Sequence, residues 1–94
     1  MLGENKVLKN RRSEIEIISK ILNVSRQGAR KTEILYQGNL SYMQLQSYLP
    51  FLIEKDILFE ETVANNGSSY KKYKLTDKGS NLYNDIQKVL VHLS

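Results

Sequence analysis

Apolar residues recur at helical spacing in several stretches of this chain. Isoleucine and leucine residues fall on one face of a helix that the pattern predicts over about residues 13–24. A short strand is predicted near residues 29–30, followed by a short helix over residues 32–37. Residues 1–11 show no clear period and contain several lysines, so we expect a flexible, basic segment there.

Residues 38–53 have the pattern of a turn followed by a further helix. Gly38 can end the preceding helix in the left-handed conformation, and Ser41, with a glutamine three residues later, has the spacing of a capping box. The helix is expected over residues 42–55, with its leucines toward the core. Because the apolar pattern continues beyond Pro50, we expect this proline to kink the helix and not to end it. Two helices joined in this way form a helix-turn-helix.

Two strands are predicted over residues 57–63 and 70–75, joined by the polar segment 64–69. Asn66 and Gly67 tolerate positive φ, so the pair should form a hairpin with an exposed tip. A hairpin that follows a helix-turn-helix is a wing. Its lysines could reach phosphates beside a groove that the preceding helix occupies.

Thr76 is expected to cap a last helix that runs to the end of the chain. Its aliphatic residues from Leu82 to Leu93 have the 4-3-4 spacing of a coiled-coil seam. We expect the far end of this helix to project beyond the domain and to expose three aliphatic side chains, which calls for a partner. The alternative is a helix that folds back on its own domain.

Composition limits the class of protein. Ninety-four residues suit a single domain, there is no cysteine, and no apolar run approaches the roughly 20 residues that a bilayer span requires. We therefore expect an intracellular protein without disulfides, and no membrane partner. Residues 1–31 carry eight Lys or Arg against three Glu, whereas residues 32–62 carry one Lys against five acids. This distribution could place basic patches on one face, as phosphate binding requires, or it could be scattered solvated charge.

No constellation of catalytic residues is apparent. His92 is the only histidine, and without cysteine it cannot build a transition-metal site. The chain has no Gly-rich phosphate loop and no nucleophile turn. We therefore predict no enzyme activity, no cofactor and no small-molecule substrate. The outward side of residues 42–50 instead carries uncharged amide and hydroxyl groups, which suit base edges, although an ordinary polar face would look similar.

The order of elements, together with Asn39-Leu40-Ser41-Tyr42 and the segment Leu75-Thr76-Asp77-Lys78-Gly79, resembles the archaeal winged-helix proteins. That family includes small chromatin-associated DNA binders and predicted transcriptional regulators. The resemblance implies a homodimer joined by a C-terminal antiparallel coiled coil, although the last helix is short here. Pro50 also departs from the polar or basic residue that such helices usually carry.

The prediction is therefore a mainly α, α+β fold: a winged helix-turn-helix domain over residues 1–79, with a flexible basic N-terminus, and a dimerisation helix over residues 80–94. The expected function is double-stranded DNA binding in the cytoplasm, at the nucleoid, through a recognition helix (41–55) and a wing (62–72). A protein-interaction module without DNA binding is the alternative. The predicted DNA-binding residues are Arg30, Lys31, Thr32, Ser41, Tyr42, Gln44, Gln46, Ser47, Lys71, Lys72 and Lys74. The predicted dimer-interface residues are Leu82, Ile86, Val89, Leu90 and Leu93.

Overall fold

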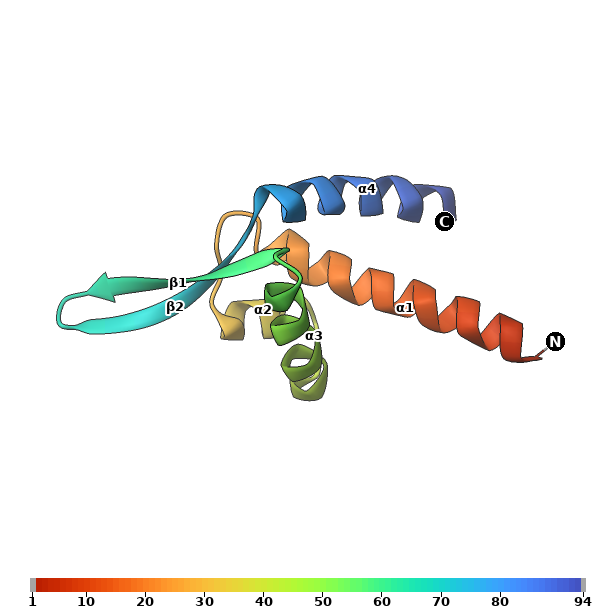
Figure 1. Ribbon diagram of the computed structural model, residues 1–94. Coiled ribbons are helices and arrows are strands. Elements are labelled where there is room, and N and C mark those ends of the chain that lie inside the picture. Colours follow the sequence, from red (N-terminus) through yellow and green to blue (C-terminus); the bar gives the residue numbers. More distant parts are fainter. Residues whose placement is uncertain (1, 94) are drawn as a thin grey trace.

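Three helices, a hairpin and a last helix follow one another in the computed structural model, which describes the backbone of residues 2–93 and the side chains of residues 13–92. The elements are α1 (Leu2–Val24), α2 (Lys31–Gln37), α3 (Tyr42–Glu54), β1 (Leu58–Asn65), β2 (Ser68–Leu75) and α4 (Asp77–Leu93). Figure 1 shows α1 and α4 extending to one side of the domain and the hairpin extending to the other. This is the mainly helical winged helix-turn-helix that the sequence predicted.

Helix α1 is longer than expected. It begins at Leu2, so the predicted start near residue 13 is wrong, and the segment expected to be irregular is helical. Residues 4–12 contain neither proline nor glycine, and most of their side chains favour helix, so nothing in that stretch interrupts the turns. Met1 lies outside the described residues.

Helix α4 lies antiparallel beside α1 (Figure 1). The Tyr83 hydroxyl donates a hydrogen bond to Asn23 Oδ1 (3.0 Å), and Gln87 Nε2 donates to Ser19 Oγ (2.7 Å). The residue that is later on α4, Gln87, thus contacts the residue that is earlier on α1, Ser19, as antiparallel helices require. The far half of α4 therefore has a surface of its own chain to pack against.

Several residues of the predicted dimer seam are used in this packing. Ile86 is buried, and Leu82 and Leu90 are half-buried against the core. The expectation that Leu90 projects away from the domain is thus wrong, because α4 lies along α1 and packs against it. Val89 remains 45% exposed. The side chain of Leu93 lies outside the described ones.

The turn between α2 and α3 differs from the prediction in one residue. Gly38 is right-handed (φ −80°), and Asn39 takes the left-handed conformation (φ 51°). Asparagine tolerates this region better than most side chains do. Gly38 is needed for space instead, because a Cβ built on it would lie 2.6 Å from the carbonyl oxygen of Ile34.

Helix α3 begins and continues as predicted. Ser41 Oγ accepts from the backbone N–H of Gln44 (3.1 Å), and Gln44 Oε1 accepts from that of Ser41 (3.0 Å), which completes the capping box. The helix passes through Pro50 to Glu54. Leu52, fully buried beyond the proline, shows why: packing of the second half offsets the lost backbone hydrogen bond.

The hairpin is tighter than predicted. The strands pair as far as Asn65 and Ser68, which leaves only Asn66 (φ 47°) and Gly67 (φ 85°) in the turn. Positive φ at both positions is typical of a type I′ turn, which matches the twist of the strands. The six-residue connection expected from the sequence is therefore wrong, since polar Asn and Ser residues extend both strands.

The short strand expected before α2 is a single residue pair. Ala29 donates to the carbonyl of Tyr73 (3.0 Å) and accepts from its N–H (2.8 Å). Both side chains are buried, with 1% and 2% exposure. Thr76 caps α4 as predicted, because its Oγ1 accepts from the N–H of Gly79 (2.9 Å).

Candidate nucleic-acid interface

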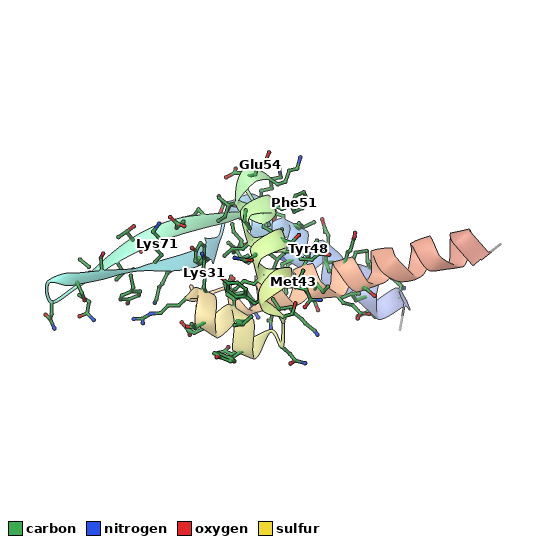
Figure 2. All side chains as sticks on the ribbon, turned by 90° about the horizontal axis from the view of Figure 1, so that it is seen from below. Lys31, Met43, Tyr48, Phe51, Glu54 and Lys71 are labelled. Atoms are coloured by element: carbon green, nitrogen blue, oxygen red, sulfur yellow. The ribbon has the colours of Figure 1, made fainter. Side chains whose placement is uncertain are left out.

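The outward side of α3 is the most accessible part of the helix-turn-helix. Leu45, Leu49 and Leu52 are buried, so the helical period directs Met43 and Ser47 away from the core. Figure 2 shows Met43 near the start of α3 and Glu54 at its other end. Glu14 of α1 lines a hollow with Ser47 and Tyr48 on one flank of α3.

Ser41 and Gln44 are partly engaged within the protein. The capping box occupies the hydroxyl oxygen of Ser41 and the carbonyl oxygen of the Gln44 side chain. Their remaining donors, the hydroxyl hydrogen and the amide NH₂, still face outward from the start of the helix. Gln46 and Ser47 are exposed and make no hydrogen bond of this kind. They are better placed for base edges than the capping pair.

A hollow of about 430 Å³ lies along one flank of α3. It is lined by three residues of α3 at four-residue spacing, Tyr42, Gln46 and Pro50. Lys31, at the start of α2, also lines it. The structure therefore brings three predicted site residues together. Predicted residue Thr32 lines a second hollow, of about 330 Å³, at the root of the wing.

The predicted wing lysines do not form one surface. Successive residues of a strand point to opposite faces, and Tyr73 defines the face that packs on the helices. Lys71 shares that face, as shown beside Lys31 in Figure 2. Lys72 and Lys74 lie on the other face, where both would contact a Cβ built on Gly28, within 3.7 Å.

Arg30 also lines the hollow at the root of the wing, but its guanidinium lies on the second face. Its guanidinium carbon lies 3.7 Å from the centre of the Tyr70 ring. Residue 30 and residue 72 are neighbours across the bridge that joins Ala29 to Tyr73, which explains the shared direction. Sequence reasoning grouped all these cations in one site, whereas the register of the strands divides them between two faces.

Lys71 is held by an acid on the neighbouring strand. Its Nζ lies 3.0 Å from Glu60 Oε1, and the Tyr73 hydroxyl donates to Glu60 Oε2 at 3.0 Å. The hydrogen bond from Lys71, and then that from Tyr73, lowers the pKa of Glu60. Burial, and then the carboxylate, raises the pKa of Tyr73 to about 12. This network fixes Lys71 at the root of the wing.

We expect Lys71→Gln to raise the pKa of Glu60 toward its ordinary value, because the strongest donor to the carboxylate is weakened. A depressed pKa in the folded state contributes stability that is present above the unfolded pKa and lost as pH falls through the folded one. The variant should therefore lose less stability on acidification than the parent does. An NMR titration of the Glu60 carboxyl carbon measures the shift, and Lys74→Gln, on the other face, is the control. An unchanged Glu60 titration in Lys71→Gln would contradict the network.

Two exposed residues near the turn were missed by the sequence reasoning. Met43 is 80% exposed on the outward side of α3, and Tyr36 is 79% exposed on the last turn of α2. The signal was present, since large apolar side chains at positions that the helical period turns outward call for an explanation. Together with Tyr42 (65% exposed) they add apolar contact area beside the polar groups of α3.

The described residues offer little for other chemistry. Among the side chains described, no three His, Cys, Asp or Glu residues gather as a metal ion would require. No helix in the described part of the chain is long and apolar enough to cross a bilayer.

Comparison with known proteins places these features in a family. The family model described as winged helix-turn-helix matches residues 11–92. An uncharacterised protein of Methanocaldococcus jannaschii is 28% identical over 85 residues, which cover 89% of this chain and 79% of that protein. Among solved structures, Sso10a-2, a DNA-binding protein from Sulfolobus solfataricus, is similar with a TM-score of 0.71 and 26% identity, over 81% of this chain and 76% of that one.

A PadR family transcriptional regulator from Eggerthella lenta has the same fold, with a TM-score of 0.69 and 15% identity over 99% of this chain and 90% of that one. The predicted resemblance to archaeal winged-helix proteins is confirmed by the two relatives from archaea. Since the family model covers most of its length, the chain belongs to the winged helix-turn-helix family.

Proposed function

We propose that this protein binds double-stranded DNA and regulates transcription, with the N-terminal half of α3 in the major groove. The observation that carries the proposal is the exposed, uncharged polar surface that Gln46 and Ser47 form on α3, with Lys31 beside Gln46. An α-helix fits the major groove, and cations beside it can neutralise phosphates. A similar structure described as a DNA-binding protein supports the same ligand.

Individual side chains have distinct parts in this proposal. The amide of Gln46 and the hydroxyl of Ser47 contact base edges, and Met43 offers an apolar contact to a thymine methyl group. Lys31 and Lys71 contact phosphates, and Tyr42, Thr32 and the donors of Ser41 and Gln44 contact the backbone near the start of α3. Binding of this kind also predicts association with the nucleoid.

The test is the salt dependence of binding to a short duplex, followed by fluorescence anisotropy. The two lysines placed at phosphates, Lys31 and Lys71, should give a slope of log K against log salt of about −2. Gln46→Ala should change the sequence preference by about 1–3 kcal/mol, as expected for one lost base contact. An affinity that does not change with salt would refute DNA binding and favour a protein-interaction module.

We also propose a homodimer, through the flank of α4 that is not packed against α1. Val89 is the exposed member among the described residues of the predicted seam, and Leu82, half-buried against the core, lies seven residues before it. Val89→Asp should make the protein monomeric at concentrations where the parent is dimeric, as measured by sedimentation equilibrium. Val91→Asp is the matched control, because Val91 is 72% exposed on another side of α4. A parent chain that is monomeric at high micromolar concentration would contradict the proposal.

A further inference from the structure

A second cationic surface lies on the face of the hairpin that points away from the helices. We call it the outer face and define it by Arg30, Lys72 and Lys74. The face follows from the register, because Tyr73 and Ala29 occupy the opposite, buried face and residues alternate between the two. Arg30 and Lys74 are exposed and Lys72 is half-buried on this face of the hairpin, which extends away from α1 and α4 (Figure 1).

The groups of the outer face are held in place by uncharged neighbours. The guanidinium of Arg30 stacks on the ring of Tyr70, with 3.7 Å between its central carbon and the ring centre. Such stacking restrains the guanidinium and leaves its N–H edge available for bidentate binding of a phosphate. The aliphatic stems of Lys72 and Lys74 run beside Gly28, at 3.6 and 3.5 Å from a Cβ built there. The contact with Gly28 thus supports the aliphatic part of each lysine.

Among the described side chains, the charge of the outer face is only partly balanced by acids. Glu61 faces Lys72 across the strands, which leaves three cations against one acid on this face. No carboxylate among the described residues lies within ion-pair distance of Arg30, Lys72 or Lys74. Lys71, on the opposite face, is by contrast paired with Glu60 at 3.0 Å. The outer face therefore has more unpaired positive charge than the wing side that faces α3.

One rigid duplex cannot contact both faces of the hairpin at this position. Lys72 and Lys74 are five and seven residues from Gly67 at the turn, which corresponds to roughly 16–23 Å along a strand. The minor groove is only about 7.5 Å deep. If the turn enters a groove of the duplex that α3 reads, the outer face stays outside it. Its cations then face solvent, or another polyanion.

We propose that the outer face binds the phosphate backbone of a second DNA duplex, so that each protomer holds two duplexes. The contact is to phosphates and not to bases, because the three groups are cations on a flat sheet with no helix to enter a groove. The second step should therefore be independent of sequence and strongly dependent on salt. The proposal rests on DNA being the ligand of α3, and the test below separates the two.

The test is the number of short duplexes bound per protomer, measured by sedimentation velocity with a labelled duplex that holds one α3 site. Counting per protomer makes the result independent of dimerisation. The parent protein should bind two duplexes, and Lys72→Gln/Lys74→Gln should bind one, with its first step changed less than about twofold and its second weakened at least about tenfold. Lys20→Gln/Lys88→Gln is the matched control. It removes the same charge from exposed positions on α1 and α4, and it should still bind two.

Four other results would overturn the proposal. A parent protein that binds one duplex per protomer has no second site. Equal weakening of both steps in Lys72→Gln/Lys74→Gln would show that the outer face belongs to the α3 site, and an equal loss in the control would show that the second step reflects net charge alone. A parent protein that binds no duplex would refute the proposed function as well. Thermal unfolding followed by circular dichroism checks that each variant is folded.

Discussion

Gly79→Ala is expected to destabilise the fold by about 3 kcal/mol, at the upper end for a group forced into a packed site. Gly79 lies in the first turn of α4, and a Cβ added there would overlap the backbone carbonyl of Ile57. That carbonyl is held in place, since it accepts hydrogen bonds from both the N–H (3.1 Å) and the hydroxyl (3.1 Å) of Thr76. Neither Gly79 nor the Ile57 carbonyl can move away without loss of the hydrogen bonds that Thr76 makes to both.

Urea denaturation followed by circular dichroism measures this effect as a shift of the midpoint. Ser80→Ala is the control, because Ser80 is exposed on the next position of the same helix and tolerates a methyl group. The control should keep the midpoint of the parent within error. A Gly79→Ala midpoint equal to that of Ser80→Ala would show that α4 has room to shift and that the contact is not a constraint.

Ser47→Asp is expected to weaken DNA binding by about a hundredfold. Ser47 lies on the outward side of α3, opposite the buried leucines, so the new carboxylate would face the bases and phosphates of the groove. Like charges placed together across an interface cost several kcal/mol, and about 2.7 kcal/mol already corresponds to a hundredfold. The fold should not change, because the position is exposed on the helix surface.

Ser80→Asp introduces the same charge on α4 and separates a local effect from a change in net charge. Anisotropy titrations of both variants, at one salt concentration, should show a large loss for Ser47→Asp and less than about a threefold loss for Ser80→Asp. If both variants bind like the parent, α3 is not the surface that contacts DNA, whatever the fold suggests.

The parts of the fold that depend on neighbours in sequence were predictable. The capping box at Ser41, the cap at Thr76 and the continuation of α3 through Pro50 are decided by residues within one or two turns. The left-handed residue at the turn was assigned to Gly38 and lies at Asn39, because Gly38 is required by its close approach to the Ile34 carbonyl one turn earlier and not by a positive φ.

The parts that depend on distant contacts were less predictable. The packing of Ile86 and Leu90 follows from the placement of α4 beside α1, which brings together residues 60 or more positions apart in the chain and has no local signal in the sequence. The division of the wing cations between two faces could have been found, since residues 71 and 72 must point in opposite directions on any strand. Which face lies toward α3 could not, because it depends on the pairing of Ala29 with Tyr73.

That pairing has a mechanical consequence. Ala29 is joined to Tyr73 through both of its backbone groups, and α2 begins two residues later, so the root of the wing and the start of the helix-turn-helix form one stiff joint. A torque on the hairpin is then transmitted to α2 and α3 instead of being absorbed by the intervening loop. DNA that contacts both elements must adopt the curvature set by this joint. Sequences that bend easily should therefore be favoured even at positions that no side chain touches.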